Sequence, residues 1–124
     1  MPSLLDELSQ GRNNPGFIRM GFSPQTPAAI VEGMVNTYLE VPPFVWYADL
    51  NACNNFDVSQ EVEKITLPAL IIVGADDKLT PPKLSQYLAA NIKDSRLEII
   101  SDSGHFLMLE KPEELNRLIL EFSI

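Results

Sequence analysis

An uninterrupted apolar run constrains the fold of this chain more than any other feature. Ala69-Leu70-Ile71-Ile72-Val73 leads directly into Gly74, and two aspartates, Asp76 and Asp77, follow. A run of this length without polar alternation predicts a strand buried on both faces, as in parallel sheets covered by helices. Polar residues just past the carboxyl end of such a strand lie where open α/β sheets bind their ligands. The stretch therefore predicts an α/β fold with a candidate site at its end.

A second strand and several helices are expected around this run. Arg96 to Ile100 predicts the second strand, so the order from residue 69 is strand, helix, strand, helix, and the strands should be parallel. The residues from Gly11 to Pro24 predict a loop, because they are rich in glycine, asparagine and proline. Helices are expected at about residues 4–8, 27–40 and 43–53, after residue 80 and from residue 112, with a short helical turn between 60 and 66.

Two threonine–proline pairs precede predicted helices. Thr26-Pro27 and Thr80-Pro81 each have the form of an N-cap followed by proline at the first helical position, where the missing N–H costs nothing. We therefore expect both threonines to cap helices.

The predicted sheet is incomplete. Two parallel strands do not form a stable sheet by themselves, and a strand that is apolar on both faces cannot be an exposed edge. We expect the remainder of the sheet to lie outside this chain.

Composition excludes several classes of function. The chain has 124 residues, 45% of them apolar, which suffices for one core and not for two. Its net charge of −8, without any basic patch, argues against nucleic acid as a partner. The apolar runs fall far short of the ~20 residues that a membrane helix needs. The one cysteine, Cys53, cannot form an internal disulfide, so we expect a cytoplasmic protein without a membrane partner.

Two side chains in this chain suit acid–base chemistry. Asp77 follows the first strand, and His105, the only histidine, follows the second. The ends of neighbouring strands lie roughly 5–10 Å apart, within reach of a hydrogen bond between the two side chains. The carboxylate would then orient the imidazole, whose other nitrogen could act as a general base toward a nucleophile.

These segments resemble the α/β-hydrolase family. Ile65-Thr66-Leu67-Pro68 with Gly74-Ala75-Asp76-Asp77 is similar to the acid-bearing strand and turn, and Ser103-Gly104-His105-Phe106 to the histidine loop. The resemblance implies that Asp77 is the triad acid and His105 the triad base. It further implies the C-terminal part of the hydrolase core at residues 57–124, preceded by a helical cap segment at residues 1–56.

The nucleophile elbow of this family, G-x-S-x-G, is absent from the chain. The nearest string, Gly21-Phe22-Ser23-Pro24-Gln25, lacks the second glycine, and Pro24 removes the backbone N–H that would line an oxyanion hole. Since the family uses serine, aspartate and other nucleophiles, the resemblance leaves the nucleophile's identity open. We expect the chain alone to be inactive.

Three other candidate residues are expected to have structural roles and no part in catalysis. We expect Asp76 to be a solvated turn carboxylate, Asp102 a polar loop residue and Cys53 a small core residue. No spacing supports a metal site built from Asp76, Asp77, Asp102 and His105, and no cofactor is expected. Three aromatic residues, Phe44, Trp46 and Tyr47, fit helix packing or, if the cap resemblance holds, a wall against the substrate.

Two functions from different classes remain. In the first, the chain is the C-terminal portion of a hydrolase that cleaves an ester or related acyl bond in a small apolar substrate. Its partner is then the missing N-terminal half of the fold. In the second, the chain is a non-catalytic module that pairs with itself through the exposed edge of its sheet.

Overall fold

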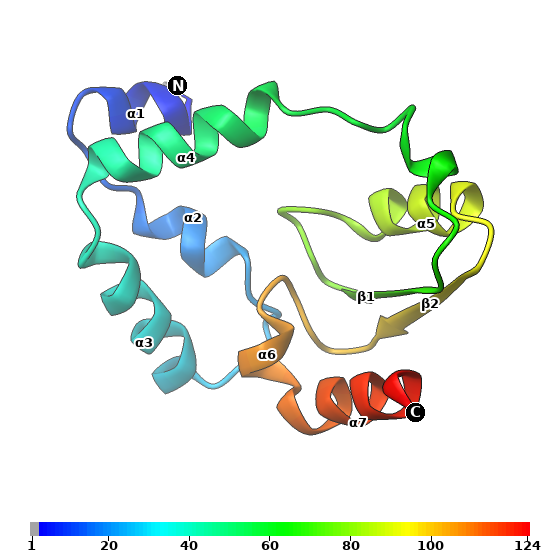
Figure 1. Ribbon diagram of the computed structural model, residues 1–124. Coiled ribbons are helices and arrows are strands. Elements are labelled where there is room, and N and C mark those ends of the chain that lie inside the picture. Colours follow the sequence, from blue (N-terminus) through cyan, green and yellow to red (C-terminus); the bar gives the residue numbers. More distant parts are fainter. Residues whose placement is uncertain (1–2) are drawn as a thin grey trace.

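The computed structural model describes residues 3–124, which form two connected parts. The first part is helical, and the second places two parallel strands between helices, as predicted (Figure 1). Helices α1 to α4 span Leu4–Ser9, Pro15–Met20, Ala28–Leu39 and Pro43–Asn55. The 3₁₀ turn η1 at Val62–Lys64 leads to strand β1, Ala69–Gly74, helix α5, Pro82–Asn91, strand β2, Ser95–Ile100, and helices α6, Leu107–Glu110, and α7, Pro112–Ser123.

The sheet lies between two helices. β1 and β2 pair in parallel, with Ala69 opposite Ser95 and Gly74 opposite Ile100. Helices α5 and α7 lie on opposite sides of the strands (Figure 1). Leu70 and Ile72 of β1 pack with the α7 side around buried Ile100 and Leu118. Within residues 3–124, each strand has a hydrogen-bonded neighbour on one side only.

The helical part has its own apolar core. Buried Ile18 and Phe22 pack against Val35 and Tyr38 of α3. Phe106, which follows His105, also packs against this cluster, and its ring stacks on Phe22 with centroids 4.6 Å apart. The loop that holds His105 is therefore packed against the helical part as well as the sheet.

Helix α2 was not predicted. Asn14 caps it by accepting a hydrogen bond from the N–H of Phe17, and Pro15 occupies the first turn, where no N–H is needed. The glycine- and proline-rich composition predicted a loop, but packing of Ile18 against α3 stabilises the helix. The prediction for Gly11 to Pro24 was thus wrong over Pro15–Met20. The short helix α6 was also missed.

Both threonine caps were wrong. Pro27 and Pro81 occupy the N-cap positions of α3 and α5, and neither helix has a side-chain cap. The hydroxyl of Thr26 donates instead to Glu110, and Thr80 contacts Asp77 and His105. Thr26 thus binds a residue 84 positions away, and Thr80 binds a carboxylate three residues before it and the imidazole 25 residues after it.

Replacing Tyr38 with phenylalanine is expected to lower the free energy of unfolding by about 1–2 kcal/mol. Tyr38 is fully buried, and its hydroxyl accepts a hydrogen bond from the backbone N–H of Asn14. The phenylalanine would leave this N–H without a partner at the start of α2. Urea unfolding followed by circular dichroism measures the loss. Tyr87→Phe is the matched control, because Tyr87 is exposed and its hydroxyl donates to the carbonyl of Ser59. Equal losses in the two variants would contradict this account.

Candidate active site

Asp77 is fixed in a tight turn just past β1. Its side chain is buried, and Oδ1 accepts hydrogen bonds from the backbone N–H groups of Leu79 and Thr80, both at 2.9 Å. The N–H of Asp77 donates to the carbonyl of Gly74, the last residue of the strand. An aspartate that binds the backbone two and three residues ahead stabilises a turn. The orientation of the carboxylate is therefore set by its own chain segment.

His105 lies beside this carboxylate. Its Nδ1 is 3.0 Å from Oδ2 of Asp77, and the hydroxyl of Thr80 is 3.1 Å from both atoms. The sheet register explains the contact, since Gly74 and Ile100 are opposite each other and both loops leave the same end of the sheet. The expected contact between Asp77 and His105 is present.

The contact determines which ring nitrogen bears the hydrogen. The hydrogen bonds at both oxygens of Asp77 come from donors, which suits an ionised carboxylate that can only accept. Nδ1 of His105 must then donate to Oδ2, so Nε2 of the neutral ring is unprotonated. Within residues 3–124, no hydrogen bond engages Nε2, and the side chain is about one-third exposed (36%). Nε2 is therefore available as a base.

Ser23 and Asp76 form a neighbouring pair. The hydroxyl of buried Ser23 donates to Oδ2 of Asp76 at 2.8 Å and accepts from the N–H of Gln25. The expectation that Asp76 is a solvated turn carboxylate was wrong, because the residue is half-buried and has this serine as a partner. Among the described residues, Ser23 makes no hydrogen bond to His105, so the geometry gives it no role as a nucleophile.

The remaining candidates lie apart from the pair. Asp102 is exposed and has a positive φ of 52°, a conformation that aspartate tolerates better than most residues. Cys53 is exposed near the C-terminal end of α4, so the expectation of a core residue was wrong. Of the three aromatic residues, Trp46 packs near Tyr38, whereas Phe44 is exposed.

Two residues of the site were missed by sequence reasoning. Thr80 was assigned to a helix cap, although its spacing of three from Asp77 fits a turn that returns to the carboxylate. Glu110 accepts hydrogen bonds from both sides of His105. No local pattern in the sequence indicates this role.

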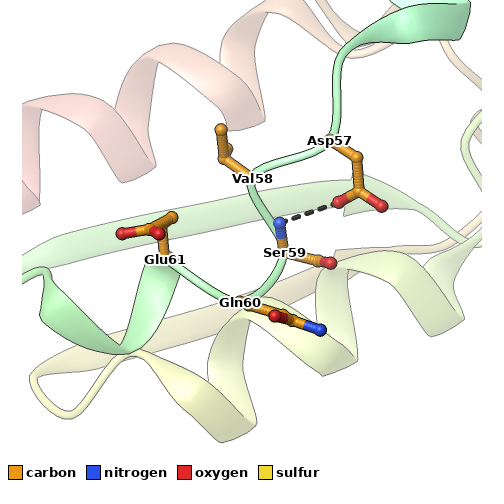
Figure 2. A pocket seen from close by; sticks show the side chains of 5 residues that line it. All are labelled: Asp57, Val58, Ser59, Gln60 and Glu61. Atoms are coloured by element: carbon orange, nitrogen blue, oxygen red, sulfur yellow. Dashed lines mark hydrogen bonds between the residues drawn. The ribbon is translucent and has the colours of Figure 1, made fainter.

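A surface hollow lies away from this pair, on the segment between α4 and η1. Asp57, Val58, Ser59, Gln60 and Glu61 line it, and Figure 2 shows the Asp57 carboxylate accepting from the N–H of Ser59. Hydrogen bonds from the side chain and backbone of Ser59 hold the pKa of Asp57 below its ordinary value. The hollow is lined by consecutive residues of one turn, and no base or nucleophile pair faces it.

Residues 3–124 contain neither a cluster of metal ligands nor a membrane-spanning helix. No three histidine, cysteine, aspartate or glutamate side chains gather in a way that could hold a metal ion. No helix in this part of the chain has the length and apolar character needed to cross a membrane.

Comparison with known proteins decides the family. The family model described as the alpha/beta hydrolase fold matches residues 20–112. The chain belongs to the α/β-hydrolase family. The match includes Asp77 and His105, and solved structures of the family resemble the chain over nearly its whole length. This confirms the predicted fold class, the C-terminal portion of a hydrolase sheet with flanking helices.

Relatives in the family are described as lipases and esterases. The chain is 25% identical over 127 residues to a mouse (Mus musculus) protein, monoacylglycerol lipase ABHD6, covering 98% of the chain and 36% of that protein. It is 32% identical over 112 residues to the pimeloyl-acyl-carrier protein methyl ester esterase of Neisseria meningitidis, covering 90% of the chain and 36% of that protein. The chain thus spans about a third of the length of these curated relatives.

Two solved structures of esterases are similar to the fold of this chain. An esterase from Exiguobacterium antarcticum superimposes with a TM-score of 0.84 at 24% identity, covering 96% of this chain and 45% of that one. A thermophilic esterase gives a TM-score of 0.76 at 30% identity, covering 87% and 44%.

Proposed function

We propose that the chain supplies the acid–base part of an active site that hydrolyses esters of small apolar acids or alcohols. The contact of 3.0 Å between Nδ1 of His105 and Oδ2 of Asp77 is the observation on which this rests. Asp77 holds the tautomer and orientation of the ring, and Nε2 is left to accept a proton. The descriptions of the relatives as esterases and lipases support the reaction class.

The reaction would proceed through two half-reactions, each with proton transfers at Nε2. As a nucleophilic hydroxyl attacks the ester carbonyl, Nε2 takes its proton, and the imidazolium is stabilised by the adjacent Asp77. The imidazolium returns the proton to the oxygen of the leaving alcohol, and the acyl group stays on the nucleophile. In the second half-reaction Nε2 takes a proton from a water that attacks the acyl group, and the imidazolium gives the proton back to the nucleophile as the acid is released. The nucleophile and the oxyanion donors are proposed to lie on polypeptide outside this chain, because Ser23 is bonded to Asp76 and makes no hydrogen bond to His105. Cytoplasmic placement remains part of the proposal and rests on the lone cysteine.

A chimera tests this proposal. The part of the thermophilic esterase that this chain does not match is joined to residues 1–124, and hydrolysis of p-nitrophenyl butyrate is followed by absorbance. We expect turnover by the chimera and none by either part alone. Turnover by the unjoined chain would contradict the placement of the nucleophile elsewhere. A folded chimera that hydrolyses neither short- nor long-chain p-nitrophenyl esters would contradict the reaction class.

A second proposal, self-association, has its own observation. Within residues 3–124 the sheet has only two strands, and apolar Ile99 of β2 is about half exposed (47%). Unpaired strand edges offer backbone groups for pairing with another chain. Light scattering on the purified chain tests self-association. A dimer at micromolar concentration supports pairing through the sheet edge, and a compact monomer excludes it.

A further inference from the structure

Three successive backbone N–H groups around His105 are all hydrogen-bonded. The N–H of Gly104 donates to both carboxylate oxygens of Glu110, at 3.0 and 3.1 Å, and the N–H of Phe106 donates to Oε2 at 3.1 Å. Between them, the N–H of His105 donates to the carbonyl of Gly21 at 2.6 Å. The N–H groups of the two residues on either side of the histidine are thus bound by one carboxylate.

The same carboxylate reaches a distant segment. Oε1 of Glu110 accepts from the backbone N–H of Ser23 at 2.9 Å and from the hydroxyl of Thr26 at 2.8 Å. These partners precede Glu110 by 87 and 84 residues and lie between α2 and α3. Glu110 therefore joins the helical part of the chain to the histidine loop.

Only a carboxylate satisfies this arrangement. Four groups donate hydrogen bonds to Glu110. An ionised carboxylate has only acceptor oxygens, so each of these donors meets an acceptor. Hydrogen bonds to a charged acceptor are roughly twice as strong as neutral ones. A glutamine has one oxygen, and its NH₂ group would face N–H donors on one side or the other.

We propose that Glu110 is a positioning residue for His105: it fixes the backbone of residues 104–106 and so holds Nδ1 against Asp77. The inference rests on the proposed function, because it gives Glu110 a part in keeping Nε2 poised as a base. The imidazole is hydrogen-bonded to Asp77 and Thr80, and Glu110 acts through the backbone N–H groups of Gly104 and Phe106.

The single histidine allows a direct test on the 124-residue chain without a tag. Long-range ¹H–¹⁵N NMR reports the two ring nitrogens of His105 and therefore its tautomer. In Glu110→Gln we expect the two nitrogen signals to move toward each other as the ring samples both tautomers. We also expect hydrogen exchange at the amides of Gly104 and Phe106 to become about tenfold faster or more. The stack of Phe106 on Phe22 remains and should keep this variant folded.

Glu114→Gln is the matched control, since Glu114 is exposed in the first turn of α7 and loses the same charge. It should leave the ring signals and both amides unchanged. If Glu110→Gln speeds exchange uniformly over the chain while the ring signals of the folded protein stay unchanged, Glu110 is only structural and the proposal is wrong.

A second variant covers the case in which Glu110→Gln does not fold. Thr26→Val removes one donor to Glu110 and keeps the side-chain shape. Exchange at Gly104 and Phe106 should rise about two- to fivefold, less than on loss of the carboxylate, and unchanged exchange would overturn the proposal. Neither readout needs turnover, so a chimera without esterase activity would refute the proposed function and leave this inference standing.

Discussion

Replacing Asp77 with asparagine is expected to reverse the tautomer of His105 and to lower esterase turnover of the chimera by about 10⁴-fold. Oδ1 of Asp77 accepts from two backbone N–H groups, so the amide oxygen of asparagine will take that position. Its NH₂ group then occupies the place of Oδ2 and points at Nδ1 of His105. Nδ1 must accept, the hydrogen moves to Nε2, and the base is lost.

The tautomer and the rate are measured separately. The ring nitrogens of the lone histidine report the tautomer in the 124-residue chain, and p-nitrophenyl butyrate reports kcat in the chimera. Asp102→Asn is the control: it removes the same charge three residues before His105, and asparagine accepts the positive φ of 52° at that position. Its kcat should change less than threefold. A normal rate in Asp77→Asn together with a reversed tautomer would show that His105 is not the base.

The apolar run from Ala69 to Val73 was sufficient to predict β1, and with Leu97, Ile99 and Ile100 it predicted a parallel pair. The contact between Asp77 and His105 followed from strand ends alone, because parallel neighbours bring their carboxyl ends to one edge. These features depend on periodicity and on sheet geometry, which are encoded locally. The catalytic roles of the two residues stay predictions.

Residues whose partners lie far along the chain could not be predicted. Thr26 and Thr80 each stand before proline, which is typical of a helix cap. Thr26 instead binds Glu110, 84 residues on, and Thr80 binds His105, 25 residues on, in addition to its neighbour Asp77. The hydrogen bonds of Glu110 were harder still to predict, since two of its partners are more than 80 residues away. The local pattern of a single sequence does not show which distant residues will be hydrogen-bonded in the fold. Where such a partner exists, the role predicted from the local pattern can therefore be wrong.

The two predicted segments, residues 1–56 and 57–124, are less separate than a cap and a core would suggest. Gly21 and Ser23 come from the first segment, and both bond the histidine loop or its carboxylate. The boundary itself stays a prediction, but the geometry of the base depends on both sides of it.

Replacing Gly74 with alanine is expected to lower the free energy of unfolding by at least about 3 kcal/mol, the upper end of what over-packing costs. Gly74 is buried at the end of β1, and a Cβ there would overlap the carbonyl oxygens of Ser103 and Gly104 and lie 2.7 Å from the carbonyl carbon of Ser103. These are backbone atoms and cannot rotate away. The loop that positions His105 would have to shift, so urea unfolding and the ring nitrogen signals should both change.

Gly33→Ala is the matched control for this substitution. Gly33 lies in the interior of α3, is exposed, and a Cβ there would meet nothing within 4 Å. Alanine should therefore stabilise the chain by about 0.5–1 kcal/mol through helix propensity. The same chemical change thus has opposite signs at the two positions. If Gly74→Ala unfolds at the same urea concentration as the parent chain, the close approach of β1 to the histidine loop does not constrain that loop.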